Sequence, residues 1–110
     1  MEKKEFDKGV VSKLSGSVDY SNDSIVSKTV LNKQTGTVTL FAFDQGQGLS
    51  EHSAPFDAMV QVVEGEGNIY IDKKLNVIGA GEFIIMPANI PHAVEAKGRF
   101  KMLLTMIKSE

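Results

Sequence analysis

The sequence contains no cysteine among its 110 residues. Disulfide bonds, thiolate zinc sites, iron–sulfur clusters and cysteine nucleophiles are therefore excluded, because each of them requires a cysteine sulfur. A chain without cysteine suits a reducing compartment, and the charged stretch at residues 1–5 is not followed by an apolar run of signal-peptide length. We therefore expect a cytoplasmic protein.

An excess of charge of one sign is also missing, as is any long hydrophobic run. The net charge is −2, and acidic and basic residues are interspersed along the chain. This composition gives no electrostatic basis for binding nucleic acid or an anionic membrane surface. No apolar stretch approaches the length that a membrane span requires. Neither nucleic acid nor a membrane is expected as a partner.

The common catalytic signatures do not occur in this chain. There is no Gly-x-Ser-x-Gly nucleophile elbow, no glycine-rich phosphate loop ending in Lys-Ser or Lys-Thr, and no His-Glu-x-x-His. The glycine pairs at Gly46 and Gly48 and at Gly65 and Gly67 are interpreted as turns or bulges between strands. These absences leave the enzyme question open.

What the chain does contain is a series of short β-rich segments. Residues 1–24 are polar and are interpreted as an amino-terminal arm, and residues 25–110 as one domain. Strands are predicted at residues 25–31, 37–43, 58–63, 68–72, 75–78, 83–86, 92–96 and 100–107. Short strands at regular spacing are typical of an all-β sandwich or barrel. A helix is the competing interpretation for residues 101–108.

The two histidines are the informative polar residues. His52 and His92 are the only histidines in the chain, and each is expected to open a strand after a turn. A single histidine at a strand end is usually a surface residue. Two in comparable settings point instead to a shared site.

The residues around His52 carry a resemblance to a known family. Gly46, five further residues and then His52, with Gly65 after the following strand, resemble the first motif of the cupin superfamily. That motif reads Gly-x5-His-x-His-x3or4-Glu-x6-Gly. The resemblance implies an all-β jelly roll, or double-stranded β-helix, in which the motif residues face the barrel interior.

The residues around His92 resemble the second cupin motif, Gly-x5-Pro-x-Gly-x2-His-x3-Asn. Gly81, Pro87 and His92 stand at the first glycine, the proline and the histidine of this pattern. Asn89 stands at its second glycine and Ala96 at its asparagine. Both motifs occur in the expected order, and with the segment between them they cover about half of the chain.

The resemblance also implies a metal site, from which this sequence departs. In metal-binding cupins three histidines and one carboxylate hold a divalent ion such as zinc, manganese, iron or nickel. The first and last histidines fall on His52 and His92, but the second histidine and the glutamate fall on Ala54 and Ala58. Two imidazoles leave the ion openly coordinated, whereas catalytic sites generally use three protein ligands.

Three polar residues near these alanines are candidates to complete a metal site. Glu51 and Asp57 lie close to the motif in sequence, and Gln61 follows on the next strand. If Ala58 points inward, strand alternation turns Gln61 to the other face. Asp57 precedes the strand and is less constrained.

The residues predicted to face inward form a small apolar lining with two polar groups. They are His52, Ala54, Ala58, Val60, Val62, His92, Val94 and Ala96. Such a lining suits a small organic ligand that a few polar groups hold in one orientation. Three functions remain open: a module that binds or senses a small molecule, a metal-dependent oxygenase or isomerase, and a remnant whose histidines bond only each other or water.

The strand at residues 58–63 is apolar on both of its faces. Met59 and Val63 flank Gln61 on the face opposite Ala58, and residues 38–43 show the same two-sided pattern. A sheet that is apolar on both faces needs cover on both. We expect a second sheet on one face and a partner subunit on the other, which predicts a homodimer. Cover by the amino-terminal arm is the alternative for Met59.

Overall fold

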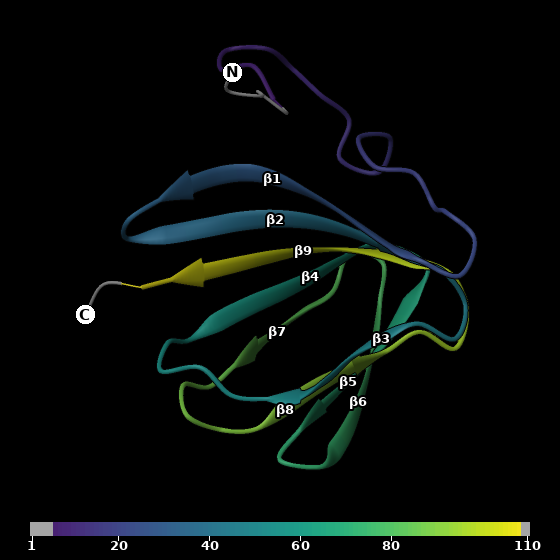
Figure 1. Ribbon diagram of the computed structural model, residues 1–110, viewed down its shortest axis with the longest axis vertical. Coiled ribbons are helices and arrows are strands. Elements are labelled where there is room, and N and C mark those ends of the chain that lie inside the picture. Colours follow the sequence, from purple (N-terminus) through teal and green to yellow (C-terminus); the bar gives the residue numbers. More distant parts are fainter. Residues whose placement is uncertain (1–5, 109–110) are drawn as a thin grey trace.

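Two antiparallel sheets face each other in the computed structural model, which describes residues 6–108 (Figure 1). One sheet has five strands in the order β1-β2-β9-β4-β7, and the other has four in the order β3-β8-β5-β6. The strands are β1 (Ile25–Lys33), β2 (Gly36–Phe43), β3 (Gly48–His52), β4 (Ala58–Glu64), β5 (Glu66–Ile71), β6 (Lys74–Gly79), β7 (Phe83–Met86), β8 (His92–Glu95) and β9 (Phe100–Ile107). The predicted all-β jelly-roll barrel is confirmed, and the described part of the chain contains no helix.

The core lies between the two sheets, where alternate side chains of each strand point inward. Phe43 and Phe100 stack face to face, with ring centroids 4.8 Å apart and ring planes 2° apart. Val60 and Met102 are fully buried beside them. A Cβ at Gly67 would overlap the Phe100 ring, so only glycine fits there. The alternation expected from the sequence therefore builds the barrel interior.

The main difference from the prediction is one additional strand, while several other strands differ by one or two residues at their ends. β3 lies in a stretch for which no strand was predicted, and His52 ends this strand rather than opening one. Four of the five β3 residues are exposed, and Gly48, Ser50 and Glu51 lack the bulk typical of strands. The strand conformation of β3 is therefore stabilised by pairing with β8 and not by the strand propensity of its own residues.

The carboxyl-terminal segment, for which helix and strand were both predicted, is a strand. Residues 100–107 form β9, which pairs with β2 on one side and β4 on the other, so the helical alternative is wrong. A strand with two neighbours in its sheet satisfies its backbone hydrogen bonds on both edges. Between β5 and β6, Asp72 and Lys73 both have positive φ, which identifies the tight hairpin turn as type I′ despite its lack of glycine.

Residues 6–24 pass along the outer face of the five-stranded sheet (Figure 1). Val18 is 1% exposed and packs with Leu40 and Ala42 of β2. The Tyr20 hydroxyl donates to Glu64 (2.6 Å), and burial together with this bond raises the pKa of the phenol. Apolar packing and a buried hydrogen bond thus fasten this segment to the sheet.

A buried lysine adds to the attachment of the arm. Lys101 is 6% exposed, its ammonium donates to the Ser15 carbonyl (2.6 Å), and it lies 3.7 Å from the Glu64 carboxylate. Val63 of β4 also packs under the arm, in the cluster with Val18, whereas Met59 is not part of that cluster. The arm therefore covers one half of the outer face of the five-stranded sheet.

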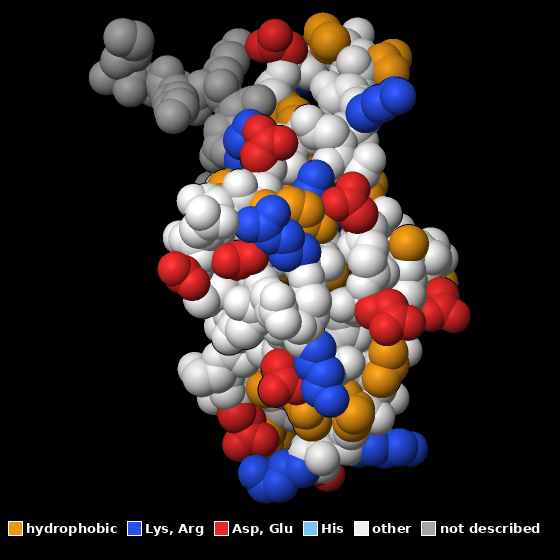
Figure 2. All heavy atoms as spheres, turned by 90° about the vertical axis from the view of Figure 1, so that its right-hand side faces the viewer, with side chains coloured by type: hydrophobic (Ala, Val, Ile, Leu, Met, Phe, Trp, Pro, Cys, Tyr) orange, Lys and Arg blue, Asp and Glu red, His pale blue; other side chains and the backbone are white. Residues whose placement is uncertain are grey.

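Charges of both signs alternate on the end of the barrel that Figure 2 shows. Acidic and basic side chains lie side by side there. That end offers no extended basic surface. Elsewhere in the contacts of the barrel, Arg99 and Asp44 form an ion pair at 2.7 Å. Among the described residues, no helix has the length and apolar character needed to cross a membrane.

Candidate functional site

The two histidines meet because β3 pairs with β8. His52 and His92 are direct cross-strand partners, and a register shift separates their pair from the Leu49–Val94 pair of the same ladder. Their Nε2 atoms are 3.2 Å apart, and the rings meet edge to face with centroids separated by 4.4 Å and planes 71° apart. Residues separated by 40 positions in the sequence thus form one imidazole pair.

The pair lies where the barrel interior meets solvent. His92 is 6% exposed at the start of β8, whereas His52 is exposed at the end of β3. Ala58, Val60 and Val94, which the sequence predicted beside the histidines, are buried in the barrel core. Val62 and Ala96 are buried there as well. Ala54 is half-buried in the loop between β3 and β4.

The hydrogen bonds of the two rings decide which nitrogens carry protons. Nδ1 of His52 lies 2.8 Å from the Ser50 carbonyl oxygen, and Nδ1 of His92 lies 3.3 Å from the Ile90 carbonyl oxygen. A carbonyl only accepts, so each Nδ1 carries a hydrogen. In two neutral rings both Nε2 atoms then present lone pairs to each other. A proton shared between the two Nε2 atoms satisfies both of them, and a donor from a bound molecule satisfies one.

Burial keeps the inner ring of the pair uncharged. It lowers the pKa of His92 below the usual 6.5, and the neighbouring His52 lowers it further, while the Ile90 carbonyl partly offsets both effects. His92 is therefore neutral at pH 7, with its Nε2 available as an acceptor. The site favours a partner that donates a hydrogen bond.

Two loops hold the histidines in place. The Asn89 amide donates to the Ala54 carbonyl (2.7 Å), and the Ala88 amide donates to Asp57 Oδ1 (2.9 Å), so the β3–β4 and β7–β8 loops are tied together. Asn89 has a φ of 66°, a left-handed conformation that asparagine tolerates better than most residues. This explains how asparagine replaces the glycine of the second motif.

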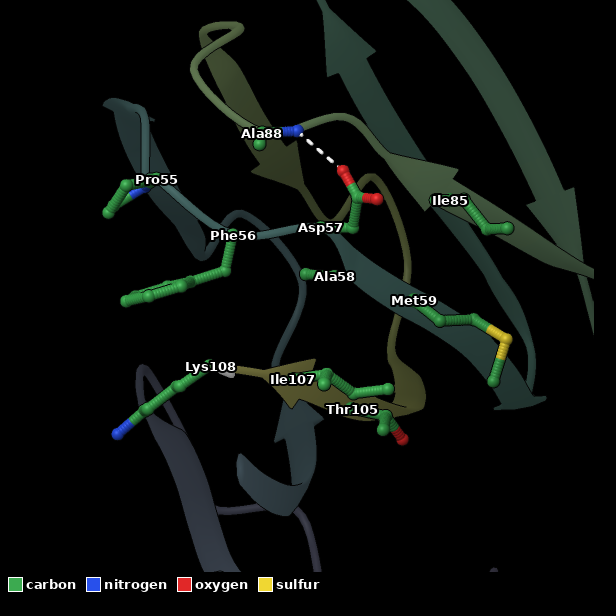
Figure 3. Close-up of a pocket in the computed structure, with 10 residues that line it drawn as sticks. All are labelled: Pro55, Phe56, Asp57, Ala58, Met59, Ile85, Ala88, Thr105, Ile107 and Lys108. Carbon is green, nitrogen blue, oxygen red and sulfur yellow. Dashed lines mark hydrogen bonds between the residues drawn. The ribbon is translucent and has the colours of Figure 1, made fainter. Parts of the chain in front are cut away.

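The residues present do not fit a resident divalent ion. The Asp57 carboxylate is turned to the Ala88 amide, as Figure 3 shows, and Glu51 is paired with Lys73 at 3.3 Å. Among residues 6–108, no group of three or more histidine, cysteine, aspartate or glutamate side chains is placed to hold a metal. The imidazole pair supplies two ligands, fewer than the three that catalytic zinc sites generally use.

A groove of about 660 Å³ lies elsewhere, at the end of the five-stranded sheet (Figure 3). Met59, Ile85 and Ile107 come from three neighbouring strands and line it, with Phe56 and Lys108 at one end. Three further hollows, of about 430, 350 and 280 Å³, also lie on the outside of the barrel. Neither histidine lines any of these four. The sequence missed this groove, although Met59, one residue of the two-faced strand signal, is among its lining residues.

Comparison with known proteins agrees with the motifs. Residues 39–108 match the cupin domain family. A conserved protein of unknown function from Streptococcus pyogenes superposes with a TM-score of 0.91 and 36% identity, over 97% of this chain and 94% of that one. A cupin superfamily protein from Desulfitobacterium hafniense has a TM-score of 0.89 with 23% identity, over 99% of this chain and 100% of its own.

A longer relative comes from Leptotrichia buccalis and is described as a cupin 2 conserved barrel domain protein. It is 44% identical over 86% of this chain, with a TM-score of 0.83, and this chain spans 46% of its length. The search among curated proteins gave no match.

Proposed function

The chain belongs to the cupin family, and from this premise we propose that His52 and His92 bind a small organic molecule without a resident metal ion. The observation that carries the proposal is the 3.2 Å separation of two Nε2 atoms whose rings both use Nδ1 on a carbonyl. Two acceptors this close gain most from a donor that lies between them. The expected ligand is therefore a small molecule with an apolar body and a hydroxyl or N–H group.

The surroundings of the pair support a small ligand. Buried Ala58, Val60 and Val94 belong to the packed core, so a ligand of the pair would have to lie on the open side of the barrel beside exposed His52. Apolar walls with a few convergent polar groups are the usual composition of small-molecule sites. Ala54, in the adjoining loop, adds a small side chain that leaves room there.

Phenol and toluene form a matched pair of probes, because the first carries a hydrogen-bond donor that the second lacks. At pH 7.5 we expect phenol, and not toluene, to raise the thermal midpoint and to shift the imidazole NMR signals of both histidines. His92→Ala removes the response. Glu51→Gln, a change at the exposed neighbour of His52, retains it. If neither histidine signal responds to any small alcohol or phenol, the site is a remnant and the proposal is wrong.

A metal-dependent oxygenase or isomerase is the competing function. The same Nε2 separation favours it, because two nitrogens each ~2.0–2.1 Å from one tetrahedral ion lie about 3.3 Å apart. Metal analysis of the purified protein distinguishes the two functions. A stoichiometric transition metal that is lost in His52→Ala supports the enzyme, whereas a metal-free protein that responds to phenol supports the binding module.

A further inference from the structure

The two imidazoles are held by carbonyl bonds of unequal length. Nδ1 of His52 donates to the Ser50 carbonyl at 2.8 Å, whereas Nδ1 of His92 donates to the Ile90 carbonyl at 3.3 Å. The tautomer of a neutral imidazole is set by the hydrogen bond that one of its nitrogens makes. The longer bond is the weaker one, so the tautomer of His92 is the more easily changed of the two.

A second arrangement of the pair competes with the one that accepts a ligand. If the hydrogen of His92 moved from Nδ1 to Nε2, it would point at Nε2 of His52, 3.2 Å away, and the two rings would bond each other. The facing lone pairs would then no longer await a donor. The Ile90 carbonyl opposes this closed arrangement, because Nδ1 without a hydrogen would face a carbonyl oxygen. The position of Ile90 therefore selects between an open and a closed pair.

Ile90 lies in the loop of residues 87–91, which belongs to neither β7 nor β8. Three hydrogen bonds attach this loop to other parts of the chain. They join the Ala88 amide to Asp57 Oδ1 (2.9 Å), the Asn89 amide to the Ala54 carbonyl (2.7 Å), and the Asp72 amide to the Pro91 carbonyl (2.8 Å). Two of the three are formed by backbone atoms alone. The third depends on a single side chain, the carboxylate of Asp57.

We propose that Asp57 is a positioning residue that keeps the imidazole pair open to its ligand; this inference rests on the proposed function. Asp57 directly precedes β4, which pairs with β7 on one side and β9 on the other. Its carboxylate accepts from the Ala88 amide, two residues before Ile90 (Figure 3). A charged acceptor makes a stronger hydrogen bond than a neutral one. Asp57 thus anchors the loop to the sheet and holds the Ile90 carbonyl against Nδ1 of His92.

Glu82 makes a matched contact at the other end of β4. Its carboxylate accepts from the Gly79 amide (2.8 Å) in the turn between β6 and β7, and its carbonyl accepts from the Val62 amide (3.0 Å). Both Asp57 and Glu82 therefore hold a loop of the barrel through one carboxylate and one backbone amide. Only the loop that Asp57 holds carries a carbonyl bonded to an imidazole. Removing each carboxylate in turn separates a general loss of stability from a change at the pair.

Long-range proton–nitrogen NMR spectra of the full chain at pH 7.5 show which nitrogen of each histidine carries the hydrogen. We expect Nδ1 in both rings of the wild type and of Asp57→Asn, whose amide oxygen can still accept from Ala88. In Asp57→Ala the hydrogen of His92 should move to Nε2, whereas Glu82→Ala should leave it on Nδ1. An unchanged His92 in Asp57→Ala overturns the inference, as does the same change in Glu82→Ala.

Titration with phenol distinguishes failure of this inference from failure of the proposed function. Asp57→Ala should bind phenol about tenfold more weakly than the wild type, because a pair that bonds itself must first be opened. Asp57→Asn and Glu82→Ala should bind it as the wild type does. If the tautomer follows Asp57 but no form of the protein binds phenol, the proposed function is wrong and the positioning role stands. Equal phenol affinity in Asp57→Ala and the wild type overturns the positioning role.

Amide hydrogen exchange in the wild-type protein provides a test that does not require Asp57→Ala to fold. The Ala88 amide should exchange at least about tenfold more slowly than the same amide in an unstructured peptide, because the Asp57 carboxylate holds it. An Ala88 amide that exchanges at the rate of an unstructured peptide shows that the loop is not held in solution, and the inference is then wrong.

Discussion

Two alanines and two histidines define the chemistry of this barrel at the scale of single residues. The histidines retain the positions that cupin motifs assign to metal ligands, while Ala54 and Ala58 offer no lone pair. Nearby acids do not compensate, because Asp57 and Glu51 are engaged by the Ala88 amide and by Lys73. What remains is a pair of imidazoles at the edge of an apolar core.

The lowered pKa of His92 predicts how stability depends on pH. The folded protein resists protonation of this ring, so between the unfolded value near 6.5 and the lower folded value the unfolded state binds more protons. The stability that uncharged His92 contributes is fully present above about pH 6.5, and it is lost as the pH falls through the pKa of His92 in the folded protein. Urea unfolding at pH 7.5 and at pH 5 measures the decline, which His92→Gln should reduce.

Phenol binding should weaken over the same acidic range, because a protonated His92 no longer accepts a hydrogen bond. A titration between pH 5 and 8 in the wild-type protein checks this. Affinity that is constant over that range would remove both histidines from the site. Tighter binding at low pH, seen with an anion such as benzoate, would instead indicate recognition by a charged imidazole.

Restoring the missing ligands should convert the site into a metal site. Ala54→His combined with Ala58→Glu is expected to raise zinc affinity by orders of magnitude, because four donors replace two and the carboxylate offsets part of the charge of the ion. Ala58 is 4% exposed, so the larger side chain costs ~1–3 kcal/mol of stability by overpacking. Isothermal titration at neutral pH decides the outcome. A folded double variant that binds zinc no better than the parent would show that the four positions do not converge.

The amino-terminal arm is the feature that matters most at the scale of elements. Residues 6–24 contain no strand or helix, yet Val18 is as buried as the barrel core. The Tyr20 hydroxyl reaches Glu64, and the Lys101 ammonium reaches the Ser15 carbonyl, only while the arm is in place. The arm therefore contributes to the stability of the barrel beneath it.

Truncating Val18 measures that contribution. Val18→Ala should lower the free energy of unfolding by about 2 kcal/mol, because it removes two buried methyl groups and leaves a cavity above β2. Val11→Ala is the control, since Val11 is 98% exposed, and it should change stability by less than about 0.5 kcal/mol. Chemical denaturation of both variants compares them directly. Equal effects would mean that the arm is detached in solution.

At the scale of the whole molecule, the predicted homodimer would couple assembly to stability. If two copies associate through the exposed apolar side chains on the outer face of β7 and β9, such as Ile85, dissociation accompanies unfolding and the thermal midpoint rises with protein concentration. Scans over a hundredfold range of concentration should show this rise for the wild type and for Val77→Glu, a change at an exposed position of the other sheet. For Ile85→Glu the midpoint should be independent of concentration. A midpoint that does not vary in the wild type would argue for a monomer.

The elements of the fold could largely be predicted, because their signals are local. Strands such as β7 and β9 have the predicted bounds, since apolar alternation and flanking turn residues act within a few positions. β3 was missed because an exposed strand has little hydrophobic pattern of its own. The β5–β6 turn was uncertain because Asp72 and Lys73 adopt a conformation that glycine usually supplies.

The sequence by itself determined the cupin barrel, which side chains of β4 face its interior, and that only two of four ligand positions can bind a metal. Each of these depends on residue type and spacing along one segment. Only the tertiary structure decided that His52 and His92 stand 3.2 Å apart, that Asp57 turns to the Ala88 amide, and that the arm covers Val63 but not Met59. These depend on the register between strands far apart in the chain and on side-chain orientation. Both are set by packing across the whole molecule, which no local pattern encodes.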